Sequence, residues 1–211
     1  MKDIVIIGAG GFGREVAWLI EDINKLSQEW NILGFVDDDE TLLGKNVNKY
    51  KVIGNLEWLK KQELYVVCAI GNPIVKKNVL ENLRESKNIY PILIHPSVIC
   101  SDSVQIDEGA IICAGNIITV DIKIGKHVII NLDCTIGHDA VLGDYTTILP
   151  SSNISGNVIT EECVSIGTGS AIIQGVTIGK NSIVGAGAVV IKNIPCNSTA
   201  VGVPAKPICN N

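Results

Sequence analysis

The sequence predicts two successive domains of different class, a small α/β domain followed by a coil of short parallel strands. Residues 1 to about 90 alternate apolar strands with helical patterns, which is typical of a small parallel sheet covered by helices. From Ile94 onward the large aliphatic residues recur with a period of six. We therefore expect a Rossmann-like domain over residues 1–93 and a repeat domain over residues 94–211.

The composition excludes several classes of protein. The chain is 46% hydrophobic and only 4% aromatic, with a net charge of -5 and no basic run, which argues against a nucleic-acid partner. It contains no apolar run long enough for a membrane span, and the Gly-rich start with Asp3 makes a poor signal peptide. We expect a cytoplasmic protein whose 7 cysteines are reduced and whose cysteine spacing predicts no metal site.

The first domain shows the alternation of strands and helices directly. Asn72 followed by Pro73 is a good helix start, with a capping side chain and proline at the first helical position. The expected strands are Asp3–Ile7, Asn31–Val36, Leu64–Ile70 and Ile89–Ile94, and the expected helices are Phe12–Asn24 and Pro73 to about Ser86.

A glycine-rich motif lies between the first strand and the first helix. Its residues fit the pattern GxGxxG, and Asp37 follows at the end of the second strand, as in dinucleotide-binding proteins. Such glycines let phosphate oxygens reach backbone N–H groups at a helix N-terminus. The domain is too short for both halves of a dinucleotide fold, which disfavours NAD; a purely structural motif is the alternative. The candidate residues are Gly8, Gly10, Gly11, Phe12 and Gly13.

The repeat domain is defined by one aliphatic position in every six residues. A period of six excludes an α-helix and suits a coil of three short flat strands, each sending one large side chain inward. The 17 positions run from Ile94 to Val190, and 15 of them are Ile, Leu or Val. With three strands per coil, the domain would contain between five and six coils.

In these repeats the sequence resembles the hexapeptide-repeat acyltransferases, whose pattern is aliphatic, Gly/Asp/Glu, any, any, small, any. By that resemblance the coil is a left-handed parallel β-helix. The segments GAGGFG, VDDD, AIGNP, IGHD and GVPAK extend the resemblance over nearly the whole chain, to the NeuD/PglD group of bacterial sugar acetyltransferases. The resemblance implies transfer from acetyl-CoA to the amino group of a UDP- or GDP-linked amino-deoxysugar. O-acetylation of a sialic acid is the alternative.

His138 is the candidate catalytic base. It precedes Asp139, and a neighbouring carboxylate can orient an imidazole and stabilise its protonated form. His95 lies at the domain junction, and we expect His127 in a solvent-facing position. A metal enzyme of the β-helix carbonic anhydrase type would need three converging histidines, and only His127 and His138 fall within the coils. We expect direct transfer, because Cys134 occupies an inward position; a non-catalytic scaffold is the remaining alternative.

The resemblance also assigns binding residues. Gly156 would present its N–H to the acetyl carbonyl, and Asn131 would meet the acceptor; a turn glycine and a corner asparagine are the alternatives. Asp37, Asp38 and Asn72 would contact the nucleotide. The positions beside the coenzyme arm are Gly167, Thr168, Gly185 and Ala186, with Lys206 near a coenzyme phosphate or solvated in the tail.

The sequence departs from the family pattern at one position, and the resemblance also implies an oligomeric state. Some relatives carry a second histidine nine residues after the first, where this chain has Thr147, so the groups that polarise the acetyl carbonyl, or the substrate, are expected to differ. The resemblance further implies a homotrimer in which each active site lies between neighbouring β-helices.

Overall fold

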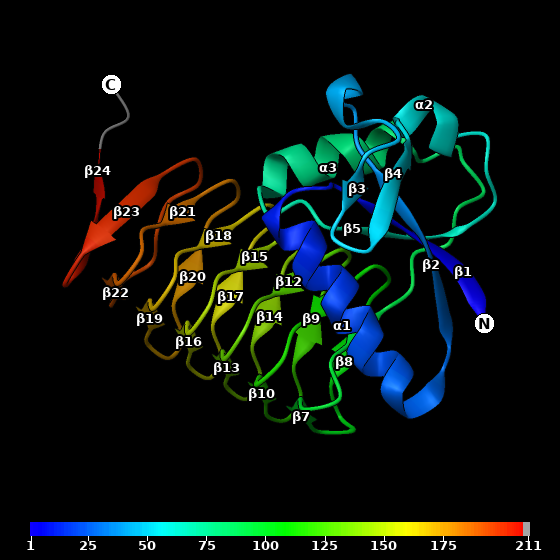
Figure 1. Ribbon diagram of the computed structural model, residues 1–211. Coiled ribbons are helices and arrows are strands. Elements are labelled where there is room, and N and C mark those ends of the chain that lie inside the picture. Colours follow the sequence, from blue (N-terminus) through cyan, green and yellow to red (C-terminus); the bar gives the residue numbers. More distant parts are fainter. Residues whose placement is uncertain (209–211) are drawn as a thin grey trace.

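The computed structural model describes residues 1–208 and shows an α/β domain beside a β-helix (Figure 1). Cys209 and the end of the expected 94–211 domain lie outside the described residues. No helix in the described part of the chain is long and apolar enough to cross a membrane.

The first domain is a five-stranded sheet in the order β3-β4-β2-β1-β5. Its strands run parallel, except that β3 and β4 form an antiparallel hairpin. The strands are β1 (Lys2–Ile7), β2 (Trp30–Val36), β3 (Asn46–Val47), β4 (Tyr50–Gly54) and β5 (Tyr65–Cys68). The helices are α1 (Gly11–Ser27), the 3-10 turn η1 (Glu40–Leu42), α2 (Leu56–Leu59) and α3 (Pro73–Asn82).

Several details of this domain differ from expectation. Helix α1 ends at Ser27 rather than at Asn24. The helix that begins at Pro73 ends at Asn82 rather than near Ser86. The expected strand Ile89–Ile94 is divided: Ile89 forms only an isolated bridge to Tyr65, while Leu93 and Ile94 form the first strand of the β-helix. The short elements β3, β4 and α2 were not predicted, because runs this short carry little periodicity.

The second domain is a left-handed parallel β-helix of 17 two-residue strands, each ending at a predicted hexad position. They form three parallel ladders. The first sheet contains β6 (Leu93–Ile94), β9 (Ile111–Ile112), β12 (Ile129–Ile130), β15 (Thr147–Ile148), β18 (Ser165–Ile166) and β21 (Ile183–Val184), continued by the hairpin β23 (Thr199–Gly202) and β24 (Ala205–Ile208). The second sheet contains β7 (Ile99–Cys100), β10 (Ile117–Ile118), β13 (Thr135–Ile136), β16 (Asn153–Ile154), β19 (Ala171–Ile172) and β22 (Val189–Val190). The third contains β8 (Gln105–Ile106), β11 (Lys123–Ile124), β14 (Val141–Leu142), β17 (Ile159–Thr160) and β20 (Thr177–Ile178).

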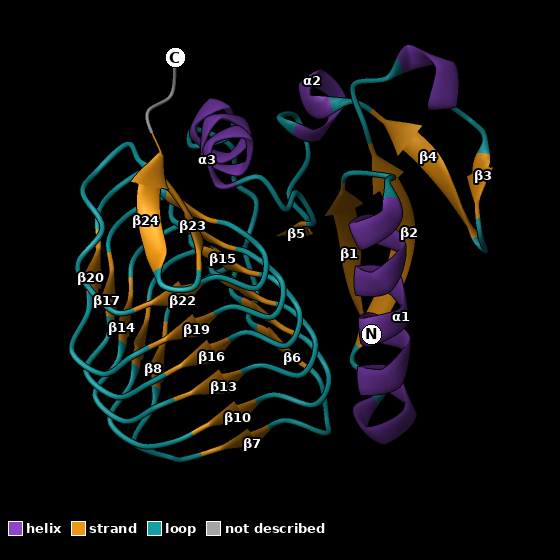
Figure 2. Cartoon of the chain, turned by 90° about the vertical axis from the view of Figure 1, so that its left-hand side faces the viewer, coloured by secondary structure: helices purple, strands orange, loops and turns teal. Residues whose placement is uncertain are grey.

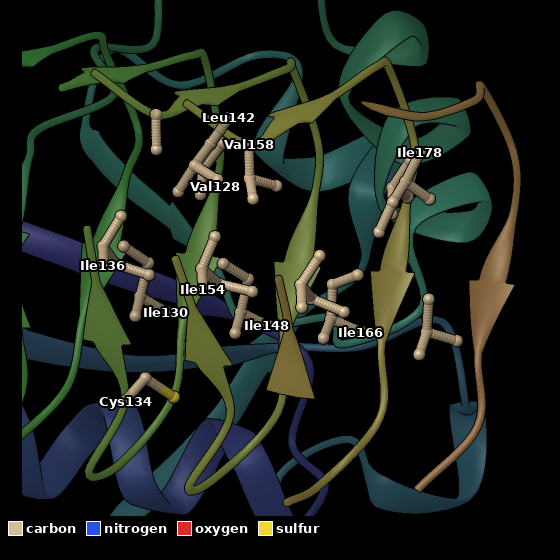
Figure 3. Close-up of a cluster of buried hydrophobic side chains, with 14 of the residues drawn as sticks. Val128, Ile130, Cys134, Ile136, Leu142, Ile148, Ile154, Val158, Ile166 and Ile178 are labelled. Carbon is tan, nitrogen blue, oxygen red and sulfur yellow. The ribbon is translucent and has the colours of Figure 1, made fainter. Parts of the chain in front are cut away.

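The inward aliphatic side chains stack from coil to coil and fill the β-helix (Figure 3). Ile130, Ile148 and Ile166 form one such column, and each is 0% exposed. Cys134 lies in the same interior, as its inward position predicts. Removing this much apolar surface from water is what stabilises strands that are only two residues long.

The corners between sheets have a regular backbone conformation. Every sixth residue from Gly109 to Gly187 has a positive φ. Several of these are glycine, and many others are Asp or Asn, the residues that tolerate this left-handed conformation best. Asp139, with φ of 60°, is one of them.

The first domain docks on the outer face of the first sheet. Leu93, Ile111 and Ile129 point outward from that sheet, yet each is at most 1% exposed, because they share a core with α1 and the strands behind it. Further along, α3 lies across the same sheet. Figure 2, which looks along the β-helix, shows α1 beside this face. The corner between the second and third sheets is therefore the corner away from the docked domain.

The expected solvent-facing position of His127 is wrong. The ring is 6% exposed and lies between Tyr90, at 5.0 Å between ring centroids, and Tyr145, stacked at 5.7 Å. Gly109 makes room for it, since a Cβ there would lie 2.1 Å from Nδ1. The hexad pattern places His127 outside its own coil correctly, but the docked domain then covers that corner. Burial, assisted by the nearby Lys76 charge, lowers the pKa of His127 to about 4.

Because the imidazole of His127 is buried, we expect the stability of the folded protein to fall at acid pH. Because the pKa of His127 is depressed in the folded state, the unfolded chain binds a proton first as the pH falls below about 6.5. The stabilisation is complete above that pH and is lost progressively down to about pH 4, by up to roughly 3 kcal/mol. His127→Phe should keep the aromatic stack and reduce the drop in thermal midpoint between pH 7 and pH 5. An equal drop in both proteins would contradict this assignment.

Candidate active site

His138 and Asp139 occupy the corner between the second and third sheets, directly after β13. The Nδ1 atom of His138 lies 2.8 Å from Oδ2 of Asp139, and both side chains are about half exposed, at 51% and 54%. The Asp139 N–H donates to the carbonyl of Val120 in the preceding coil, which fixes the corner. A carboxylate can only accept, so Nδ1 carries the proton and Nε2 is left free to receive one.

Gly156 lies beside His138 in the next coil. A Cβ on Gly156 would come within 2.5 Å of Nε2 and Cε1 of His138, so the imidazole occupies space that only glycine leaves open. The coils are also close at Gly137, where a Cβ would lie 2.5 Å from the Gly156 nitrogen. Among residues 1–208, the Gly156 N–H donates to no protein acceptor, so this buried group beside the imidazole has an unused hydrogen-bond donor.

The residues expected along the coenzyme arm lie at a different corner, between the first and second sheets. Gly167 and Gly185 follow β18 and β21 there, and a Cβ on Gly167 would lie 2.5 Å from the nitrogen of Ala186. Thr168 belongs to the same corner. Within one chain the structure therefore does not bring these residues to His138.

Asn131 and Lys206 are likewise separate from His138 within the chain. Asn131 lies at the corner between the first and second sheets, is 8% exposed, and accepts a 2.7 Å hydrogen bond from the Leu132 N–H. Lys206 is exposed on β24, in the hairpin that continues the first sheet.

The glycine-rich loop presents an uncapped helix N-terminus. Gly10 is the N-cap of α1 and makes no side-chain capping bond. Within the described chain, the N–H groups of Gly11, Phe12 and Gly13 have no acceptor, whereas a helix N-terminus ordinarily needs one. A Cβ on Gly13 would lie 1.9 Å from the Gly8 carbonyl oxygen, so the third glycine permits close packing of helix and loop. Free donors and the helix dipole together favour an anionic ligand such as a diphosphate.

Asp37 and Asp38 are engaged by backbone donors beside this loop. Asp37 accepts from the N–H of Ala9 at 2.9 Å and from that of Asp39 at 3.0 Å, so it braces the glycine loop. Asp38 accepts from the Leu56 N–H at 2.9 Å through one oxygen. Both line a cavity of about 280 Å³ whose other walls are mostly apolar, among them Ile70 and Val79. Its volume and its mostly apolar lining suit a nucleoside.

Asn72 caps α3 as the sequence predicts, accepting from the N–H groups of Ile74 and Val75 at 3.0 and 3.1 Å. The first-turn donors of α3 are thereby satisfied, unlike those of α1, so α3 offers no comparable anion site. Asn72 lies at a second cavity, of about 230 Å³, which the sequence did not predict. It is formed between the start of α3 and the first sheet, where Leu149 and Ser165 line it.

Thr147 is buried in the first sheet. It is 1% exposed, and its hydroxyl accepts a 3.0 Å hydrogen bond from Nζ of Lys76 on α3. It therefore does not present a polarising group at the His138 corner. Lys76 itself was missed, because nothing in the helical pattern distinguishes a buried lysine from a solvated one.

The remaining histidine and the inward cysteine have structural positions. His95 lies at the domain junction as predicted, with Nε2 3.1 Å from Oδ2 of Asp22 on α1. His95, His127 and His138 thus lie at separate places in the fold. Burial raises the pKa of the Cys134 thiol to about 11, which makes a poor nucleophile at neutral pH.

Comparison with known proteins decides the family. Residues 3–83 match the model of the PglD N-terminal domain. The chain is 35% identical over 213 residues to a GDP-perosamine N-acetyltransferase of Escherichia coli O157:H7, with 95% of this chain and 94% of the relative covered. The chain belongs to the NeuD/PglD family of sugar acetyltransferases.

Solved structures of this family share the whole fold. A point mutant of perosamine N-acetyltransferase from Caulobacter crescentus, in complex with CoA and GDP-perosamine, has a TM-score of 0.90 at 33% identity, covering 100% of this chain and 98% of that one. The acetyltransferase domain of PglB from Neisseria gonorrhoeae, in complex with acetyl coenzyme A, has a TM-score of 0.88 at 31% identity, covering 98% and 99%.

The close approach at Gly156 gives a test of the site geometry. Gly156→Ala should push the His138 ring off its position, because the new Cβ would overlap the imidazole. We expect kcat to fall roughly 10- to 100-fold with an unchanged thermal midpoint, since the ring can move into solvent. Ser155→Ala, the neighbouring exposed position, serves as the control. Full activity in Gly156→Ala would show that the position of His138 beside Gly156 is not needed for activity.

Proposed function

We propose that the protein transfers the acetyl group of acetyl-CoA to the amino group of a UDP- or GDP-linked amino-deoxysugar. The observation that carries this is the His138–Asp139 pair lying over Gly156, a base beside a free backbone donor. The uncapped N-terminus of α1 and the apolar cavity next to it support a nucleotide diphosphate as the handle of the acceptor. Relatives that act on GDP-perosamine, and on UDP-N-acetylbacillosamine in Bacillus subtilis, support this substrate class.

The chemistry follows from the geometry of the corner. The sugar amine attacks the thioester carbonyl carbon while Nε2 of His138 accepts the proton that the amine loses. Asp139 holds the imidazole in the required tautomer and stabilises its protonated form. The Gly156 N–H stabilises the oxyanion. When the carbon–sulfur bond breaks, the proton on His138 passes to the departing thiolate, which leaves as CoA.

A complete site requires a neighbouring chain in this proposal. His138 lies at the corner away from the docked domain, whereas the nucleotide cavity belongs to that domain. Coils on either side of His138 expose aliphatic side chains at the same corner, Val120 at 46% and Ile173 at 43%. The second sheet also exposes Ile99 and Ile117, at 66% and 43%. A cytoplasmic homotrimer that packs these surfaces together would bring one chain's acceptor to another chain's His138, beside the corner of Gly167 and Gly185.

The substrate class is tested by release of free thiol from acetyl-CoA against a panel of UDP- and GDP-linked amino sugars and free sialic acids. We expect turnover with a nucleotide-linked amino sugar. His138→Ala should fold normally and lose at least about a hundredfold in kcat, the usual contribution of a general base. Turnover with sialic acids alone would instead identify the O-acetyltransferase alternative. Full activity of His138→Ala would refute the site.

The assembly is tested by sedimentation. The wild-type protein should sediment as a trimer, because the exposed aliphatic side chains of Ile99 and Ile117 on the second sheet need a partner. Ile117→Glu should shift it towards monomer and reduce activity in parallel. Ile159→Glu, at an equally exposed position of the third sheet (42%), is the matched control. A fully active monomer would contradict a site shared between chains.

A further inference from the structure

Lys76 makes a buried contact between the two domains. Its side chain is 0% exposed, and its Nζ donates to the hydroxyl of Thr147, 71 residues further along the chain. Lys77, the next residue, forms a partly exposed ion pair with Glu162, which also pairs with Lys180. The same helix therefore contacts the β-helix twice, once in the interior and once at the rim.

The surroundings of Lys76 contain no matching negative charge. The titratable groups that face it are the thiol of Cys68 on β5, the thiol of Cys163 at a corner of the β-helix, and the imidazole of His127. Within residues 1–208 no carboxylate pairs with Lys76, and the one hydrogen-bond partner of its Nζ is the Thr147 hydroxyl. An ammonium group has three donors, so at least two would remain unsatisfied, whereas a neutral amine can both donate to and accept from a hydroxyl. The docked arrangement therefore favours the neutral amine.

Helix α3 forms a wall of both cavities next to the nucleotide-binding loop. Val75 and Val79 line the nucleoside-sized cavity, and Asn72 and Ile74 line the cavity between α3 and the first sheet. Lys76 lies within one turn of all four, and its N–H donates to the Asn72 carbonyl. Any movement of α3 along the first sheet would change the shape of both cavities.

We propose that Lys76 is a positioning residue whose hydrogen bond to Thr147 fixes α3 on the β-helix and so sets the affinity for the nucleotide part of the acceptor. This inference rests on the proposed function for the identity of the ligand. A buried polar contact specifies one arrangement, whereas an apolar contact of the same size tolerates sliding. Lys76 touches neither cavity; it acts through α3.

The charge state of Lys76 gives the contact a pH dependence. Burial lowers the pKa of Lys76 to about 7 in the docked structure. Because the pKa of Lys76 is depressed in the folded state, the buried charge destabilises the docking of α3 on the β-helix below about pH 7. The docking becomes more stable as the pH rises above about 7. Nucleotide affinity should therefore increase between pH 6 and pH 8.

The test compares Lys76→Met and Thr147→Val with Lys77→Met, a control on the same helix that removes the partly exposed ion pair with Glu162, a kind of contact that contributes little to stability. Calorimetric titration with UDP and with GDP at pH 6, 7 and 8 measures nucleotide affinity. Hydrogen exchange measures protection of the α3 amides without any ligand. Methionine removes a costly buried amine, so we expect Lys76→Met to fold with an unchanged or higher thermal midpoint.

We expect Lys76→Met and Thr147→Val each to weaken the better-bound nucleotide about tenfold at pH 8 and to speed exchange in α3. Lys76→Met should also abolish the pH dependence of nucleotide affinity, whereas Thr147→Val keeps the titrating amine and should retain it. KM for acetyl-CoA should stay within about twofold, and Lys77→Met should resemble the wild type. Wild-type affinity and protection in Lys76→Met would overturn the positioning role. If the wild type binds neither nucleotide, the proposed nucleotide-linked acceptor is refuted. Unchanged hydrogen exchange of the α3 amides in Lys76→Met would, independently of any nucleotide, refute the role of the Lys76–Thr147 contact.

Discussion

The inward stacking of one aliphatic side chain every six residues is the constraint on which the rest of the molecule depends. It forces the chain to turn at a corner after each two-residue strand, and the corners take a left-handed backbone conformation at every sixth position. Positions 18 residues apart are then stacked in adjacent coils, as the ladder registers show. The contact between His138 and Gly156 is one such stacked pair, so the geometry of the candidate catalytic corner is a direct product of the repeat.

The flat faces of the coil also organise the first domain. Aliphatic residues occupy both positions of β9 and β12, and the outward member of each pair is covered by the docked domain. The glycine-rich loop is thereby held beside one face, while His138 projects from the corner away from it. Acceptor binding and acetyl transfer are consequently assigned to different sides of each chain, with the β-helix as the rigid element that relates them.

The sequence was sufficient for features that depend on local patterns. The 17 two-residue strands of the β-helix, the capping of α3 by Asn72 and the pairing of His138 with Asp139 follow from spacing and neighbouring residues, whereas the hairpin of β23 and β24 was not predicted. Features that depend on how the domains dock could not be predicted from the sequence. His127 was expected in solvent because the hexad pattern describes one coil and not what covers it. The contact between Lys76 and Thr147 has no sequence signal, because only the crossing of α3 over the first sheet brings them together.

The equal spacing of the coils makes the β-helix a molecular ruler. Adjacent coils lie about 4.8 Å apart, the ordinary separation of paired strands. Gly167 and Gly185 follow Asn131, in the coil of His138, by two and three coils, which corresponds to roughly 10 and 14 Å along the axis. The number of coils therefore sets the distance along the axis between the proposed position of the thioester and the glycines proposed to hold the extended coenzyme arm. Adding or deleting a whole coil between them would leave every corner intact and yet misplace one end of the substrate relative to the other.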